Sequence, residues 1–403
     1  MFDIPVHQYN AVIEPYVSFL RKKKTEPVDY LMGLFKTYDV VILCERAHPE
    51  TTQWDMIYQL THDPQFIQDV GVIFTEYGAV TLQPRLDELL TEPKSTQEQT
   101  DQMLLDIYHN LSHWPLWPNT NFYNYLQKVS ALNKTLPTHR KIRLFFSDVP
   151  WDWAHITTHQ QLAEACEQLK VRDRIMAERI IQERNRRITA GERHKCLVIM
   201  NFRHAFRPVK PIKGSVTDNA GSHLFKAFPG RVANVLINTV RPVAVRSDSD
   251  VDLDLIHEGK WDASFQVVGN PECGFDFANS PFGVDSFDLY RFEDPVYWAL
   301  RYDEMFTGFV FYKPLDEHRW GFGIPNLIDR AFHEELHRRY AVPEAGSELA
   351  KRYEPTDFER DVDWAVARDI PWEVISSFTE IKPFDIPTRF KMEIARWLVV
   401  GKP

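Results

Sequence analysis

Acidic and imidazole side chains follow four short apolar runs of this chain, each at the point where the run ends. Carboxylates that crowd into one cleft repel one another, so they need protonation, an arginine, a protonated histidine or a bound cation. Groups coupled in this way suit general acid–base chemistry near neutral pH. In chain order, the candidate side chains are Glu45, Arg46, His48, Glu76, Asp148, Arg203 and His204.

Hydrolysis by an activated water molecule is one chemistry that this set would support. His48 or His204 would take a proton from water. Glu45 or Asp148 would orient the imidazole, and Glu76 would tune the charge of the site. The arginines that would stabilise a developing oxyanion are Arg46, Arg172 and Arg203.

Each candidate also has a purely structural interpretation. Glu76 would suit a helix N-terminus, and Asp148 would cap a turn. Arg172 would pair with Asp173 on a helix surface, where such a pair contributes little. His48 would be an exposed loop residue, and His204 would hydrogen-bond a backbone carbonyl; the sequence leaves these alternatives open.

A divalent metal is the other way to relieve the charge, and histidines with carboxylates suit Zn²⁺, Mn²⁺ or Fe. The ligands of such a site would be Glu45, His48, Glu76 and His204. The sequence does not decide between this cofactor and none. Two further histidine pairs, His109/His113 and His155/His159, have helical i, i+4 spacing but lack the glutamate of HExxH, so we interpret them as solvated helix faces.

The apolar runs predict the strands that position these groups. Helical segments at about 51–69, 80–90, 158–188 and 219–227 alternate with them, as in parallel β-α-β units covered on both faces. The predicted fold is therefore α/β, with a mostly parallel central sheet flanked by helices. Ligands bind beyond the carboxyl ends of such strands, so the candidates should share one pocket. The predicted strands are 40–44, 71–75, 142–146, 196–200, 232–237, 264–268, 286–290 and 308–312.

Changes in pattern along the chain predict the domain organisation. Residues 1–313 form an α/β catalytic core with a helical insertion at about 91–138. Residues 314–403 are charged and punctuated by prolines, among them Pro355 and Pro371, and are predicted to form a helical extension packed on the core. A lid or a dimer arm is the alternative for this segment, and the sequence does not indicate an oligomeric state.

Composition narrows the partners and the compartment. The 403 residues carry a formal net charge of −10, which disfavours nucleic acid and leaves a small-molecule substrate as the expected partner. No apolar window is long enough to span a membrane, and no signal peptide is visible. The four widely spaced cysteines form no CxxC motif, which indicates a reducing compartment, so we expect a cytoplasmic protein.

Several of these motifs together resemble the erythromycin esterase-like family, which belongs to a wider superfamily with the haem-uptake protein ChaN and the Tiki proteases. The run through Glu45-Arg46-Ala47-His48 resembles the family's strand followed by G-E-x-x-H. The resemblance continues, over about residues 38–313, at Phe74-Thr75-Glu76, Phe146-Ser147-Asp148, Arg172-Asp173-Arg174-Ile175-Met176-Ala177-Glu178, Asn201-Phe202-Arg203-His204, Ala220-Gly221-Ser222-His223-Leu224 and Asp303 to Tyr312.

The resemblance implies that Glu45, His48 and His204 are catalytic, with Arg172 nearby, and that the reaction is hydrolysis by an activated water. It also makes His223 a candidate for substrate binding or tuning, although an exposed helical position is the alternative. The chain departs from the family pattern at Cys44, Pro49 and Met200, which puts macrolide esterase activity in doubt.

The predicted function is hydrolysis of an ester, a lactone or a related acyl bond. A metal-dependent peptidase similar to the Tiki branch is one alternative. A non-catalytic protein that binds haem or another ligand, similar to ChaN, is the other.

Overall fold

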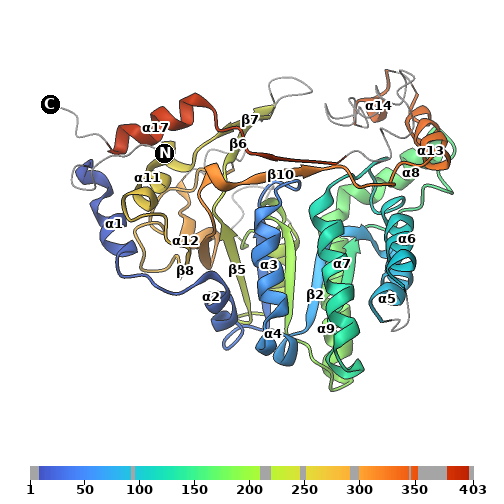
Figure 1. Ribbon diagram of the computed structural model, residues 1–403, viewed down its shortest axis with the longest axis horizontal. Coiled ribbons are helices and arrows are strands. Elements are labelled where there is room, and N and C mark those ends of the chain that lie inside the picture. Colours follow the sequence, from blue (N-terminus) through green and yellow to red (C-terminus); the bar gives the residue numbers. More distant parts are fainter. Residues whose placement is uncertain are drawn as a thin grey trace. The chain divides into compact units, whose positions relative to one another are not determined.

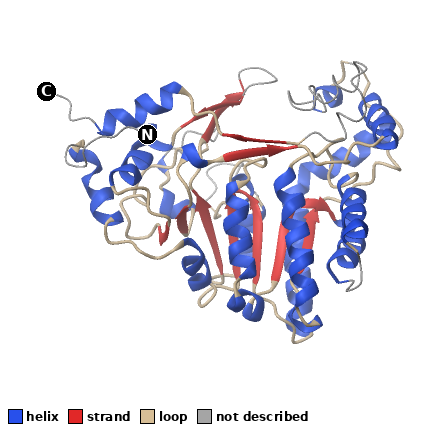
Figure 2. Ribbon diagram, viewed as in Figure 1, coloured by secondary structure: helices blue, strands red, loops and turns tan. Residues whose placement is uncertain are grey.

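The computed structural model describes residues 9–91, 96–208, 219–245, 251–290, 299–344, 346–352 and 379–398. A seven-stranded sheet carries the fold, and helices lie alongside its strands (Figures 1 and 2). Four of its strand pairs, β2–β3, β2–β4, β1–β5 and β5–β9, are parallel, and β8–β9 is antiparallel. The order is β3 (Arg143–Asp148), β2 (Val72–Ala79), β4 (Cys196–Asn201), β1 (Val40–Glu45), β5 (Val232–Ile237), β9 (Gly308–Phe311) and β8 (Cys273–Asp276).

This arrangement confirms the predicted α/β fold with a mostly parallel sheet. Strands β1, β4 and β5 are buried along their whole length. Burial on both faces explains why their sequences read as continuous apolar runs and not as alternating patterns. All four cysteines are buried and free.

Two of the predicted later strands are wrong. Residues 264–268 fall largely in helix α11 (Lys260–Val267), where Trp261 and Phe265 are buried one helical turn apart. A short apolar run does not by itself distinguish a strand from a buried helix. Among the described residues, 286–290 contribute no strand, only an isolated bridge from Ser286 to Arg301.

The chain forms two compact units. Unit 1 comprises Met1–Leu60, Asn201–Arg319 and Pro383–Pro403, and unit 2 comprises Thr61–Met200 and Trp320–Lys382. The boundary predicted at residues 313/314 stays a prediction. The C-terminal part, predicted to be a helical extension, contains helices and also contributes the strand pair β10 (Arg319–Phe322) and β11 (Glu380–Pro383). Pro355 and Pro371 lie outside the described residues.

Unit 1 contains β1, β5, β8 and β9, and a small antiparallel sheet of β6 (Arg241–Val245) and β7 (Val251–Asp254). Its short helix α10 lies within the segment 219–227 that the sequence predicts to be helical. Its helices are α1 (Glu14–Leu20), α2 (Pro27–Leu34), α3 (Thr52–His62, whose last residues belong to unit 2), α10 (Ala220–Ala227), α11, α12 (Tyr302–Met305) and α17 (Thr388–Leu398).

Unit 2 contains β2 and β3 and the predicted insertion, whose two main helices are α6 (Gln97–Tyr108) and α7 (Thr120–Thr135). Asn133 on α7 donates from its side-chain amide to the carbonyls of Leu90 and Ile142, which ties the insertion to α5 (Gln83–Thr91) and to the start of β3. The other helices that the structure describes in this unit are α4 (Pro64–Asp69), α8 (His159–Glu167), α9 (Arg172–Thr189), α13 (Arg330–Ala341) and α14 (Glu348–Arg352).

Two helices predicted as continuous are interrupted. Asp63 caps α4 by accepting hydrogen bonds from the amides of Gln65 and Phe66, and Pro64 occupies the first helical position, so 51–69 is two helices. A 3₁₀ turn at Gln168–Val171 separates α8 from α9 within 158–188. As a result, Arg172 is the first residue of α9 and does not lie in the middle of a helix.

A bulge shapes the carboxyl end of β2. Thr75 pairs with Phe146 and Ala79 with Asp148, so three residues of β2 stand opposite Ser147 alone. Gly78 lies in this bulge with φ of +95°, and the ring of Phe146 packs directly against it. Glycine is required here both for the backbone conformation and for the close approach of the ring.

Replacing Gly78 with alanine is expected to lower the free energy of unfolding by on the order of 3 kcal/mol. The new Cβ would lie 2.1 Å from Cδ1 of Phe146 while φ stays positive. Gly191→Ala is the matched control, because Gly191 has φ of +67° but no neighbouring atom lies within 4 Å of the place that its Cβ would take. That variant should lose about 1 kcal/mol. Urea unfolding of the two variants measures the difference, and equal losses would contradict the packing argument.

Candidate active site

Glu45 and His48 form a pair at the carboxyl end of β1, in which the carboxylate is buried and the histidine is partly exposed. Glu45 is fully buried, and its Oε2 lies 2.9 Å from Nδ1 of His48, whose side chain is 25% exposed. An ionised carboxylate only accepts hydrogen bonds, so with Glu45 ionised we assign the His48 tautomer that has its proton on Nδ1 and donates this hydrogen bond. The lone pair of the neutral ring is then on Nε2, which is the arrangement of a general base oriented by a carboxylate.

Arg46 holds the loop between these two residues. Its Nε donates to the Asn238 carbonyl at 2.6 Å, and its Nη1 donates to Glu50 Oε2 at 3.0 Å. Nη2 donates to Asn238 Oδ1 and to the Tyr312 carbonyl, and Nη1 also reaches Thr52 Oγ1 at 3.4 Å. Burial lowers the pKa of Arg46, and the Glu50 carboxylate opposes that effect.

All the N–H groups of Arg46 are therefore directed at protein acceptors. We assign Arg46 to positioning the loop and not to the oxyanion role that its sequence position suggested. Gln53 completes the loop, since its Oε1 accepts from the backbone N–H of Arg46 and its Nε2 donates to the carbonyls of Ala47 and Glu50. No sequence pattern singled out Gln53, Glu50 or Asn238.

His204 lies on a turn that is joined to this loop. It ends the 3₁₀ turn Phe202–His204 that follows β4, and Asn201 donates its side-chain amide to the Arg46 carbonyl at 3.1 Å. Oδ1 of Asn201 accepts from the backbone N–H and from Nε of Arg203. Asn201 thus holds the turn that carries His204 against the backbone of Arg46, the residue that follows Glu45.

His223 lies in the first turn of α10, which packs closely on the segment after His204. A Cβ on Gly221 would come within 2.6 Å of the Ala205 backbone, so glycine is needed for this approach. Asn219 caps the helix by accepting from the Ser222 amide at 2.9 Å. His223 is half-buried near the N-cap of a helix, whereas the alternative expected an exposed residue at such a position.

In unit 2, Arg172 binds two buried carboxylates. Its Nε and Nη2 donate to the two oxygens of Asp148 at 2.6 and 3.0 Å, and its Nη1 donates to Glu76 Oε1 at 3.2 Å. A bidentate arginine–carboxylate pair of this kind is strong and geometrically specific. Arg172 is therefore not the surface partner of Asp173 that the alternative interpretation proposed.

Asp148 also lies near His113, for which the sequence interpretation gave the wrong environment. Nδ1 of His113 lies 3.8 Å from Asp148 Oδ2, and both side chains are buried. The interpretation of His113 as part of a solvated helix face is wrong, because the residue lies in a loop that ends α6 and packs near Trp114 and Trp151. The signal was the run of tryptophans and prolines from Trp114 to Pro118, which indicates a buried segment.

Arg172 keeps the Asp148 carboxyl group ionised. Burial alone would raise the pKa of Asp148, yet the Arg172 charge, with help from His113, lowers it from 3.8 to about 2. The two carboxylates in turn raise the pKa of Arg172 despite its burial. Asp148 is thus ionised at neutral pH, and its charge is balanced within the protein.

The candidate residues therefore fall into two sets. Glu45, His48 and His204 belong to unit 1, and Glu76, Asp148 and Arg172 belong to unit 2. Their convergence in one pocket stays a prediction. In the described ranges, no group of three or more His, Cys, Asp or Glu side chains is arranged to hold a metal ion, including the set Glu45, His48, Glu76 and His204. No helix in the same ranges is both long and apolar enough to cross a membrane.

Neither a protein-family model nor a curated protein matches the chain. Among solved structures, it is similar to a mutant of the erythromycin esterase EreC in its open conformation, with 12% identity and a TM-score of 0.45 over 75% of this chain and 96% of that one. A Bacillus cereus protein gives 11% identity and a TM-score of 0.43 over 75% and 97% of the two chains. ChaN of Campylobacter jejuni, in a structure with cofacially bound haem, gives 15% and 0.31 over 51% and 84%.

Acid unfolding should reveal the Arg172–Asp148 interaction. The folded-state pKa of Asp148 is depressed from 3.8 to about 2, so its stabilising contribution is complete above pH 3.8 and disappears as the pH falls through about 2. The shift corresponds to about 2 kcal/mol. Asp148→Asn should lose this component of the pH dependence, measured as the free energy of unfolding between about pH 5 and pH 2. Asp152→Asn, at a largely exposed carboxylate, should retain it.

Proposed function

We propose that this protein is a hydrolase that cleaves an ester, a lactone or a related acyl bond with water activated by Glu45 and His48. The observation that carries the proposal is the 2.9 Å contact between a fully buried carboxylate and Nδ1 of a partly exposed histidine. A buried carboxylate at this position fixes both the tautomer and the orientation of the ring. The exposed part of His48 allows water and substrate to reach it.

In the proposed reaction, Nε2 of His48 takes a proton from a water molecule as the water oxygen attacks the acyl carbon. The tetrahedral intermediate then expels the alkoxide, which takes the proton that His48 had accepted from water. One water is consumed, and a carboxylic acid and an alcohol are released. Glu45 stabilises the imidazolium that exists between the two proton transfers.

We assign the oxyanion or leaving group to His204 and Arg172 in this proposal. His204 is supported by the hydrogen bond that ties its turn to the Arg46 carbonyl. Arg172 is supported by its charge and by its fixed position on Asp148 and Glu76. Glu76 and Asp148 would keep this guanidinium in place, and Arg203 and His223 would contact the substrate.

His48→Ala is expected to keep the fold and to lower kcat by about 10²–10⁴-fold, because the general base is lost. Initial rates on p-nitrophenyl acetate, p-nitrophenyl butyrate and δ-valerolactone measure the effect. His155→Ala is a closely matched control, since His155 pairs with Asp152 at 2.7 Å in the same i, i+3 geometry but is 85% exposed. The control should hydrolyse the same substrate at the wild-type rate.

Glu45→Gln extends this test, because the amide retains the size of the side chain but no longer enforces one tautomer of His48. A loss in kcat with little change in KM would support the orienting role. Wild-type rates in the His48→Ala protein would remove the proposed base. If no ester or lactone is hydrolysed by the wild-type protein, a Soret band on titration with haem would favour the ligand-binding alternative.

Chelation is expected to leave the activity unchanged. In unit 2, Arg172 already binds both Asp148 and Glu76, so these carboxylate oxygens have a protein counter-charge in the place of a cation. In unit 1, Nδ1 of His48 is bound to Glu45. The test is the rate before and after dialysis against EDTA, followed by addition of Zn²⁺ or Mn²⁺. Loss of activity on dialysis and recovery with either ion would favour a metal-dependent hydrolase.

A further inference from the structure

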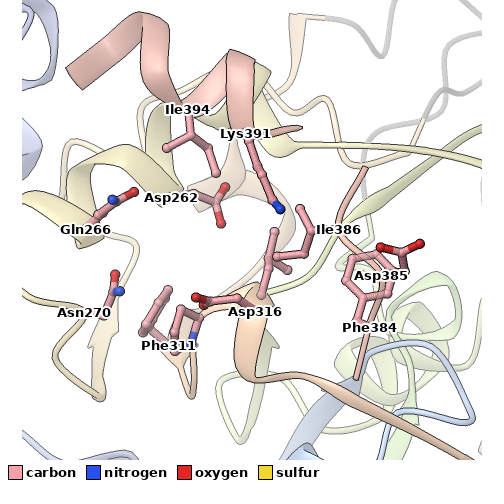
Figure 3. Close-up of a pocket in the computed structure, with 12 residues that line it drawn as sticks. Asp262, Gln266, Asn270, Phe311, Asp316, Phe384, Asp385, Ile386, Lys391 and Ile394 are labelled. Carbon is pink, nitrogen blue, oxygen red and sulfur yellow. The ribbon is translucent and has the colours of Figure 1, made fainter. Parts of the chain in front are cut away.

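A cavity of about 290 Å³ lies in unit 1, beyond the carboxyl end of β9 (Figure 3). Helix α11, the turn after β9 and the C-terminal segment with α17 enclose it. This volume is near the lower end of the range for pockets that bind small organic molecules. None of its lining residues belongs to the candidate active site.

The cavity combines apolar walls with charged groups. Phe311, Ile386 and Ile394 contribute apolar surface, and Figure 3 shows the Asp262 carboxylate turned into the space among them. The lining residues include three with carboxylates, Asp262, Asp316 and Asp385, and one with an ammonium group, Lys391. The lining therefore carries an excess of negative charge, which favours a cation over an anion or a neutral ligand.

These four charged groups are not paired with one another. Within the described ranges, none of them makes a hydrogen bond or an ion pair with another residue. Asp316, Asp385 and Lys391 are exposed at the rim, whereas Asp262 lies deeper, half-buried in the first turn of α11. A carboxylate removed from water without a partner is costly, and a bound cation would offset that cost.

The position of the C-terminal segment is held by specific contacts. Trp397 donates from Nε1 to the Glu258 carbonyl at 2.8 Å. Gly259 has φ of +77°, and a Cβ there would lie 2.9 Å from Cγ1 of Ile394, so α17 depends on glycine at this position. Phe390 is fully buried against Leu255 and Leu315. The cavity is thus a consequence of how this segment packs.

We propose that this cavity is a second ligand site, which binds an organic cation. The ammonium group would contact Asp262, and a compact apolar body would contact Phe311, Ile386 and Ile394. The inference does not rest on the proposed hydrolysis, because it uses neither its residues nor its chemistry. An ion pair with the half-buried Asp262 carboxylate provides the affinity, and the apolar walls set the size of the ligand.

Isothermal titration calorimetry of the full chain tests this site with cyclohexylammonium chloride as the probe. Cyclohexanol and cyclohexanecarboxylate are the matched neutral and anionic controls, since they retain the ring. We expect the cation to bind at least about tenfold more tightly than either control, the ratio for one charge-assisted contact. Equal or weaker binding of the cation would overturn the proposal.

Two substitutions should change the affinity in opposite directions. Asp262→Asn should weaken binding of the cation by about tenfold or more, because the amide is nearly isosteric but uncharged. Lys391→Gln should strengthen binding, because it removes a like charge that faces the same space. Asp69→Asn, at an exposed carboxylate of α4, is the control and should leave the affinity unchanged.

The pH dependence of binding provides a readout that a purely structural role would not produce. Burial raises the pKa of Asp262 to about 7, so binding should strengthen as the pH rises from about 6 to 8. The other titratable residues that line the cavity are Lys391, Asp316 and Asp385. Asp262→Asn should abolish this dependence. Unchanged affinity and pH dependence in Asp262→Asn, with an unaltered thermal unfolding curve, would exclude Asp262 as the binding group.

Discussion

A charged group removed from water has to be balanced inside the protein, and the loops after the parallel strands are organised around that constraint. Burial penalises ionisation, and a paired counter-charge is the usual remedy. In each unit one arginine provides it. Arg46 pairs with Glu50 beside the end of β1, and Arg172 pairs with Asp148 and Glu76 at the ends of β3 and β2.

The two arginines differ in burial and in their hydrogen-bond acceptors, and these differences indicate which of them has a structural role and which can contact a ligand. Arg46 is almost completely buried, and backbone carbonyls and neutral oxygens take most of its hydrogen bonds, so it joins β1 to the ends of β5 and β9. Arg172 is 18% exposed and is held by carboxylates only. A guanidinium with part of its surface accessible and its position fixed can contact a ligand, whereas a fully enclosed one organises the backbone.

The apolar runs predicted six strands of the parallel part of the sheet because burial on both faces leaves a continuous hydrophobic signature. They also placed Glu45, Glu76 and Asp148 at strand ends. Other features depend on tertiary contacts that no local pattern encodes. The 264–268 run is helical because Trp261 and Phe265 pack one turn apart, and His113 is buried because the tryptophan-rich loop around it is. Arg46 looked catalytic by position, and only its acceptors show its structural role.

Two acid–histidine pairs of the chain share the same spacing and are in contact, and their comparison shows what a local motif leaves out. Glu45 and His48 are 2.9 Å apart, and Asp152 and His155 are 2.7 Å apart, both at i, i+3. In the first pair the carboxylate is fully buried, whereas in the second it is 46% exposed and its histidine is 85% exposed. Water competes for an exposed carboxylate and screens its charge, so that pair neither fixes a tautomer nor stabilises an imidazolium strongly. The contact distance is common to both pairs, and it is burial by β1 that makes the first one suited to move a proton.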